Sequence, residues 1–363
     1  MSDLVPIHAP DPAHGSHPPL EAAQTVPDRR RQQDLPPVIF LLTRATLIRL
    51  RVFLTGFTDE LARQKPHSTT AATYHKRGTA FLRWLGQLDP TDTRRLDRTT
   101  FDAYRAYLEQ RFTNPRTKNG YLVALRQFMT FLVRFHPGLV NYAAFLKGWD
   151  CSRTHTRRHL PAEDAKPFLA TLQADARKTE LQRRRNYAMG YLMLKTGLRT
   201  IEVSRARLEH LQESVPGTIW KLWVHGKGRG SADETVQIVR EVYEAIQAYL
   251  ALRPGPLHST DPLFATTECL DRAGHTLSRA GLPLSTRSIN RILTEGLILA
   301  GVKQPGIVVH SLRHSTPTFA LLNDANPVRV QKMMRHKHYS TTEIYVEEVQ
   351  RMIGGAEETV TQI

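Results

Sequence analysis

Hydrophobic residues recur with the period of an α-helix from about residue 38 to residue 147. Three segments place them on one face, and the stretches "QLDPTD" and "RFTNPRT" between these segments carry residues that end helices. The pattern predicts a compact bundle of four or five helices, with its aromatic side chains in the core rather than stacked on nucleobases. The face residues are Ala71, Tyr74, Phe81, Leu82 and Leu85, then Phe101, Tyr104, Tyr107 and Leu108, then Tyr121, Leu125, Phe128 and Leu132.

The pattern becomes mixed after about residue 160. Helical periods run through "RRNYAMGYLMLKTG", "EVYEAIQAYLAL" and "STRSINRILTEGLILAG", and Gly197 and Gly301 stand where helix C-caps belong. Between the first two helical stretches, "TIWKLWVHGKGRGSADETVQIV" alternates like two short strands around a glycine-rich turn. We therefore expect a fold that is mainly α with a small β-sheet.

Length and composition divide the chain into two domains, because 363 residues exceed what one compact core usually serves. Residues 1–37 hold eight of the 22 prolines without a sustained period, which is typical of a disordered tail. We expect a helical domain over 38–147, a linker over 148–160, a second domain over 161–350 and a tail over 351–363.

The expected linker, "GWDCSRTHTRRHL", is polar and basic and has no apolar face. In an extended strand, Arg153, Arg157 and Arg158 are able to follow a phosphate backbone. A flexible, solubilising linker explains the same residues equally well, so both interpretations stay open.

The charge balance indicates a polyanionic partner. Lys and Arg number 50 against 34 for Asp and Glu, a formal net charge of +16, and nucleic acid is the commonest partner for such a surplus. A merely soluble basic protein is the alternative.

Two cysteines far apart form no zinc pattern or disulfide framework, and no apolar run approaches the roughly 18 residues of a membrane span. We expect a soluble, cytoplasmic protein.

Six side chains in the second domain carry the candidate chemistry, and each alone is a weak signal. An arginine past a helix end is usually a surface residue, and a histidine at a helix end complements the helix dipole. The informative feature is their order within one basic domain. The six are Arg199, Lys227, His310, Arg313, His336 and Tyr345.

These residue types together suit phosphoryl transfer on a DNA backbone. Two guanidiniums clamp the oxygens of a phosphodiester, and histidines hold or relay protons near neutral pH. A lysine protonates the leaving 5′-oxygen, and a tyrosine hydroxyl bonds to phosphorus. The sequence shows no carboxylate cluster for Mg²⁺ and no Gly-x-x-x-x-Gly-Lys-Ser/Thr loop for ATP. The set predicts a strand transferase that needs no metal and no other cofactor.

The chain resembles the tyrosine recombinases, or phage integrase family, in the stretches "LKTGLRTIEVSRARLEHL", "VHGKGRG" and "HSLRHSTPTFALLNDANPVRVQKMMRHKHYSTTEIY". Looser matches, "TYHKRGTAFLRWL" and "LVALRQFMTFLVRF", extend the resemblance over about residues 40–350. It implies a helical, SAM-like core-binding domain, then the mixed α/β catalytic domain of this family, closed as a C-shaped clamp around duplex DNA.

The resemblance implies which side chains hold the phosphate. Arg199 and Arg313 match the family's pair of phosphate-binding arginines, and Lys227 matches the hairpin lysine that acts as general acid. Glu202, three residues after Arg199, matches a frequently acidic supporting position. A solvent-exposed helix carboxylate is the alternative for Glu202.

The resemblance also implies roles in proton transfer and in the covalent step. His310 matches a general base or proton relay, and His336 matches a histidine that hydrogen-bonds the scissile phosphate. Tyr345 matches the nucleophile, which forms a 3′-phosphotyrosine and frees a 5′-hydroxyl. His314 falls where the family often keeps a histidine, and we expect it to be structural.

The implied activity is site-specific recombination of double-stranded DNA by four protomers through a Holliday junction, without metal or ATP. Two alternatives stay open: a type IB topoisomerase, which acts as a monomer, and a DNA-binding regulator that does not cleave. The family-like helical domain and the tail after Tyr345 favour the recombinase. The motifs encode neither the DNA site nor the choice between integration, excision, transposition by a mobile element and dimer resolution of replicons.

One departure from the family pattern bears on the site. Met334 and Arg335 precede the second histidine, where the family usually has Leu-Gly. If the backbone at this glycine position has a positive φ, an arginine there is costly and His336 is displaced.

Overall fold

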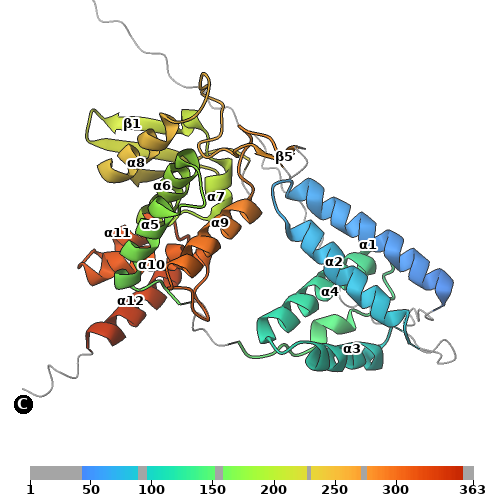
Figure 1. The fold of residues 1–363 in the computed structure, drawn as a ribbon. Helices are drawn as coiled ribbons and strands as arrows, with labels where there is room; N and C mark the ends of the chain where they lie inside the picture. The colour runs from blue at the N-terminus through green and yellow to red at the C-terminus, as the bar shows by residue number, and fades with distance from the viewer. Residues whose placement is uncertain (1–42, 89–95, 152–157, 227–229, 271–275, 355–363) are drawn as a thin grey trace, which may run out of the picture.

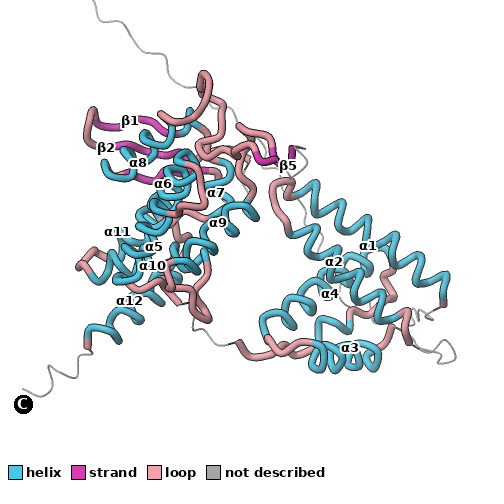
Figure 2. The backbone as a smooth tube through the Cα atoms, in the orientation of Figure 1, coloured by secondary structure: helices cyan, strands magenta, loops and turns pink. Residues whose placement is uncertain are grey.

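The computed structural model describes residues 43–88, 96–151, 158–226, 230–270 and 276–354, which form two groups of elements (Figure 1). Each group has its own hydrophobic core, and helices dominate both (Figure 2). The tail expected over residues 1–37 lies outside the described ranges. Within those ranges, no helix is both long enough and apolar enough to cross a membrane.

The first group is the predicted helical bundle. Asp97 and Asn114 begin two of its helices by accepting backbone N–H bonds, and Pro115 occupies a first helical position. All the face residues predicted from periodicity are buried or half-buried. Its elements are α1 (Arg44–Gln64), α2 (Thr70–Leu85), α3 (Arg98–Arg111), α4 (Pro115–Phe135) and the 3₁₀ helix η1 (Tyr142–Phe145).

The second group surrounds α6, whose buried side chains include Met189, Leu192 and Met193. A left-handed residue, Gly197 with φ 63°, ends α6, and Gly301 with φ 71° follows α9, as predicted for C-caps. The helices are α5 (Ala162–Ala174), α6 (Glu180–Thr196), α7 (Thr200–Arg205), the 3₁₀ helix η2 (Leu208–His210), α8 (Arg240–Leu250), α9 (Thr286–Leu299), α10 (Val309–Leu322), α11 (Pro327–Met334) and α12 (Ser340–Ile353).

A three-stranded antiparallel sheet, in the order β1-β2-β3, packs beside α8. The two predicted strands are β2 (Ile219–Val224) and β3 (Glu234–Ile238), and β1 (Leu211–Val215) adds an edge that the sequence pattern did not indicate. Trp220 of β2 stacks on Tyr243 of α8 with ring centroids 4.1 Å apart, which fixes the sheet to the helix. A second small sheet pairs β4 (Cys269–Leu270) with β5 (Thr276–Ser278).

Two glycines let neighbouring helices approach α5 closely. A Cβ on Gly190 of α6 would lie 2.7 Å from Leu172 Cδ1, and one on Gly296 of α9 would lie 2.5 Å from Leu172 Cδ2. Leu172 is therefore held from both sides by backbone. This packing places α6 and α9 against α5, and α10 also contacts both α6 and α9.

The two groups meet at the loop between α1 and α2, near β5 (Figure 1). His67 of that loop lies against Gly230, so closely that a Cβ on Gly230 would overlap the imidazole. The hairpin segment of the second group is thus in contact with the helical bundle.

Candidate active site

Arg199 is fixed by a carboxylate three residues later. It is the N-cap residue of α7, and its backbone N–H donates to Glu202 Oε2 at 2.8 Å. Its guanidinium Nη1 donates to Glu202 Oε1 at 2.7 Å. Glu202 is fully buried, so the alternative of a solvent-exposed helix carboxylate is wrong. The Arg199 side chain remains 30% exposed and is accessible to a bound anion.

Arg313 joins the ends of two helices from its position in α10. Its Nη1 donates to the carbonyl of Gly197 after α6, and its Nη2 donates to the carbonyl of Met334 at 2.8 Å. Burial, and after it the nearby Arg199 guanidinium, lowers the pKa of Arg313 to about 10. Arg313 therefore stays charged at neutral pH, and repulsion between its guanidinium and that of Arg199 contributes to its lowered pKa.

Tyr345 projects from α12 into the protein and is only 3% exposed. Its hydroxyl is hydrogen-bonded to Nδ1 of His314 at 2.5 Å. Burial raises the pKa of Tyr345 to about 12, although Arg313 acts in the opposite direction. The hydroxyl is thus protonated at neutral pH and is held by a histidine.

Two more histidines surround this hydrogen bond. The His310 ring meets the His314 ring edge-on, with centroids 4.8 Å apart. The His336 ring lies parallel to the Tyr345 ring at 6.1 Å, and its Nδ1 is 2.9 Å from the hydroxyl oxygen of Thr342. Imidazoles therefore approach the tyrosine from α10 and from the turn after α11.

At Arg335, where the family usually has a glycine, the backbone adopts a conformation that favours glycine. Arg335 ends α11 with φ 56° and ψ 43°, in the left-handed region. Its guanidinium turns inward and donates from Nη2 to Glu202 Oε2 at 2.8 Å. The His336 ring, next to this arginine in the sequence, lies parallel to the Tyr345 ring.

The structure brings most of the predicted site residues together. Arg199, Glu202 and Arg313 lie around the junction of α6, α7 and α11. The rings of His336 and Tyr345 are in contact, and His310 reaches Tyr345 through the ring of His314. Lys227, Arg153 and Arg157 lie outside the described residues. Arg158 is described and exposed; its backbone N–H donates to the Gly306 carbonyl at 3.2 Å. In the described ranges, no group of three or more His, Cys, Asp and Glu is placed to hold a metal ion.

Sequence reasoning missed two contacts of this site. It assigned His314 a structural role, whereas His314 is the hydrogen-bond partner of Tyr345. It treated Arg335 only as a cost to the backbone, whereas the side chain binds Glu202. Both pairs are far apart in sequence, so spacing carried no signal for either.

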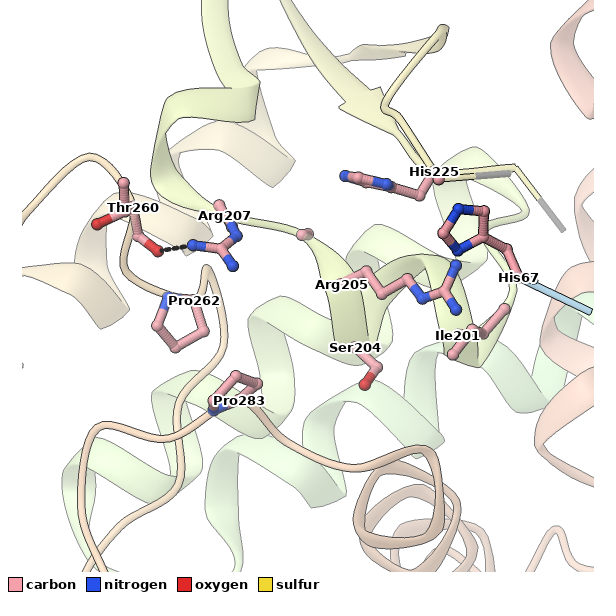
Figure 3. A pocket seen from close by; sticks show the side chains of 11 residues that line it. His67, Ile201, Ser204, Arg205, Arg207, His225, Thr260, Pro262 and Pro283 are labelled. Atoms are coloured by element: carbon pink, nitrogen blue, oxygen red, sulfur yellow. Dashed lines mark hydrogen bonds between the residues drawn. The ribbon is translucent and has the colours of Figure 1, made fainter. Parts of the chain in front are cut away.

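A basic cavity of about 620 Å³ lies at the other end of α7 (Figure 3). Arg205, Arg207 and His225 line it from the second group, and His67 lines it from the first. Among the described residues that line it, none carries a carboxylate. The helix α7 runs from its N-cap residue, Arg199, to Arg205, which lines this cavity.

Comparison with known proteins identifies one family. The family model described as "Phage integrase family" matches residues 158–351. Tyrosine recombinase XerC of Haemophilus ducreyi is 30% identical over 224 residues, covering 62% of this chain and 66% of that protein. Tyrosine recombinase XerD of Lacticaseibacillus casei is 26% identical over 280 residues, covering 76% and 87%.

A solved structure shares the fold. The recombinase XerH in a post-cleavage complex with a palindromic difH substrate matches with a TM-score of 0.57 at 17% sequence identity. The match covers 80% of this chain and 78% of that chain. The mainly helical fold with a small antiparallel sheet, expected from the sequence, is confirmed.

Proposed function

The chain belongs to the phage integrase family and is a site-specific DNA recombinase, and we propose that it cuts DNA through a 3′-phosphotyrosine at Tyr345. One observation carries this proposal. Arg313 interacts electrostatically both with Arg199, which Glu202 holds, and with a buried tyrosine, Tyr345, whose hydroxyl is bonded to an imidazole. That combination supplies charge stabilisation and a nucleophile within one site.

The covalent step follows from the chemistry of these groups. Arg199 and Arg313 bind the non-bridging oxygens of the scissile phosphate and stabilise the extra negative charge of the transition state. The Tyr345 oxygen bonds to phosphorus as the bond from phosphorus to the 5′-oxygen breaks. The phenolic proton passes to His310, the expected general base or proton relay, and Lys227 donates a proton to the leaving 5′-oxygen.

The burial of Tyr345 adds a requirement to this step. Tyr345 is only 3% exposed and its hydroxyl is bonded to His314, so the hydroxyl does not meet a phosphate at the surface. We therefore infer that α12 shifts when DNA binds, so that the hydroxyl exchanges His314 for the phosphate. His336, which is bonded to Thr342 of the same helix, then contacts the phosphate.

Double-stranded DNA is the proposed substrate. The solved XerH structure holds a difH substrate, and the excess of 50 basic over 34 acidic residues suits a phosphate backbone. We place backbone contacts at the basic cavity, through Arg205 and Arg207, and along the segment that contains Arg158. The other linker candidates, Arg153 and Arg157, remain part of this proposal.

We further propose that the α1–α4 group is a core-binding domain over 38–147 and that the second group is the catalytic domain over 161–350. Four protomers then act in the cytoplasm on two sites through a Holliday junction. Integration or excision of a mobile element and resolution of replicon dimers are compatible with this chemistry, and neither needs ATP or a metal in the proposed step.

A plasmid assay tests the proposed reaction against its nearest rival. A supercoiled plasmid with two copies of the native locus is incubated with the full chain in EDTA, and the products are separated by size and by linking number. We expect deletion or inversion products that require both sites. Relaxation of a plasmid without any site, with no recombinants, would identify a topoisomerase instead.

A further inference from the structure

Arg335 occupies a backbone conformation that is unfavourable for its residue type. Its φ of 56° and ψ of 43° are left-handed, and a side chain in this region costs on the order of 1 kcal/mol relative to glycine. A non-glycine residue persists in such a place when other interactions offset the strain. The side-chain contacts of Arg335 are therefore the place to look for its role.

The buried Arg335 guanidinium hydrogen-bonds the carboxylate of Glu202 and forms an ion pair with the partly exposed carboxylate of Glu234. Its side chain is only 6% exposed. Nη2 donates to Glu202 Oε2 at 2.8 Å, and Nε lies 3.3 Å from Glu234 Oε2. The remaining nitrogen, Nη1, is 3.4 Å from the Met333 carbonyl. Arg335 thus connects α7 to the first residue of β3.

Glu202 is shared between Arg335 and Arg199. Its Oε1 accepts from Arg199 Nη1, and its Oε2 accepts from both the Arg199 backbone and Arg335 Nη2. A carboxylate has about four acceptor positions, so these three bonds leave it little freedom. Without Arg335, the bonds that the described residues still make to Glu202 are the local ones from Arg199, and the Arg199 guanidinium loses a fixed support.

Glu234 lies at the base of the hairpin that joins β2 to β3. It pairs with Val224, the last residue of β2, and Lys227 follows Val224 by three positions. The contact between Arg335 and Glu234 therefore holds the first residue of β3 close to the C-terminal end of α11. The Arg335 guanidinium thus contacts both Glu202, which supports Arg199, and Glu234 at the start of β3.

We propose that Arg335 is a positioning residue that fixes Arg199 through Glu202 and holds the start of β3, which pairs with the end of β2, through Glu234. This inference rests on the function proposed above. Arg335 does not need to touch DNA in this role, because its side chain is buried under the site. Where a glycine would have no side chain, Arg335 contacts Glu202 and Glu234.

Single-turnover cleavage separates this role from simple loss of structure. The full chain, Arg335→Gly, Arg335→Lys and Glu234→Gln are compared on mapped native-site DNA with either a phosphodiester or a neutral methylphosphonate at the cut position. Thermal unfolding and DNA affinity are measured for each variant. Asp324→Gly is the matched control, because Asp324 also has a positive φ, of 58°, but is exposed in the turn between α10 and α11.

We expect Arg335→Gly to cleave the phosphodiester at least about tenfold more slowly, which corresponds to about 1.4 kcal/mol of transition-state stabilisation. The loss should be below threefold, or about 0.7 kcal/mol, on the methylphosphonate, because the charge that Arg199 neutralises is absent there. Arg335→Lys should recover part of the rate through Glu202, and Glu234→Gln should show a smaller loss. DNA affinity and the Asp324→Gly rate should match wild type.

Two results would overturn the inference while the proposed function stands. One is cleavage by Arg335→Gly at the wild-type rate, and the other is an equal loss on both substrates, which would mean a structural role only. If Arg335→Gly does not fold, the rates of Arg335→Lys and Glu234→Gln decide by the same comparison. Failure of wild type to cleave its native site would instead remove the proposed function and this inference with it.

Discussion

The buried carboxylate of Glu202 holds both Arg199 and Arg335 in place, and replacing Glu202 with glutamine tests how much this contributes to stability and cleavage. Glu202→Gln preserves the shape of the side chain and removes its charge. Three donors converge on the carboxylate: the Arg199 backbone N–H, the Arg199 guanidinium and the Arg335 guanidinium. A glutamine offers one carbonyl oxygen and turns an NH₂ group toward at least one of these donors.

The expected cost follows from burial. Removing one partner of a buried ion pair typically costs about 3–5 kcal/mol. Glu202 and Arg335 are almost fully buried, whereas the Arg199 side chain is 30% exposed and regains water, so we expect the lower end, about 3 kcal/mol. For a domain of this size, 1 kcal/mol shifts the melting temperature by about 2–4 °C, which predicts a decrease of about 6–12 °C.

Calorimetry of the full chain measures this shift in the transition of the catalytic domain. Glu347→Gln is the matched control, because Glu347 is 57% exposed and pairs with Arg351 on the surface of α12; its melting temperature should stay within about 1 °C of wild type. Cleavage by Glu202→Gln should fall as well, since Arg199 loses its support. A melting temperature within about 2 °C of wild type would refute the central role of this carboxylate.

Three further predictions concern other parts of the fold. The pKa of Tyr345 is about 12 in the folded state, against an ordinary value of 10.0, so the stability that its buried neutral form contributes below pH 10 is lost as the pH rises toward 12. Between pH 10 and pH 12, the free energy of unfolding of Tyr345→Phe, measured by denaturant titration, should fall by about 3 kcal/mol less than that of wild type. Gly296→Ala should destabilise by about 1–3 kcal/mol in thermal unfolding, because its Cβ meets Leu172 at 2.5 Å. Arg205→Gln should reduce the salt dependence of DNA binding by about one unit of slope per lost phosphate contact, measured by fluorescence anisotropy.

Each of these predictions has its own contradicting result. Identical alkaline unfolding of wild type and Tyr345→Phe would show that the tyrosine is not buried in solution. Gly56→Ala is the control for Gly296→Ala, since its nearest neighbour, Phe131, is 3.9 Å away; equal effects of the two would refute the close packing. An unchanged salt slope for Arg205→Gln would remove the basic cavity from the DNA path.

Periodicity predicted the helices because burial repeats along them with the helical period. In α2 and α4, the predicted faces lie against the core. The strand β1 was missed for the opposite reason: "LQESV" is an edge strand, half-buried at Leu211 and exposed elsewhere, so its sequence carries no alternation. The short strands β4 and β5 likewise offered too few residues for a period.

The sequence likewise predicted some residues and contacts of the candidate site and not others. Residue types and their order pointed to Arg199, Arg313 and Tyr345, and the resemblance to the family added Glu202. The sequence did not indicate that His314 holds the hydroxyl or that Arg335 reaches Glu202, which is 133 residues away. Those contacts depend on the packing of α11 and α12 against α10 and α7, which no short stretch encodes.

Covalent capture tests the central claim most directly. Wild type and Tyr345→Phe are mixed with DNA from the native locus in EDTA and denatured with SDS, and the protein-linked strands are sequenced. The account predicts that only wild type carries DNA, joined through a 3′-phosphate at one reproducible position. Equal capture by both proteins, or none by either, would contradict Tyr345 as the nucleophile, and the absence of any adduct would favour a DNA-binding regulator on this fold.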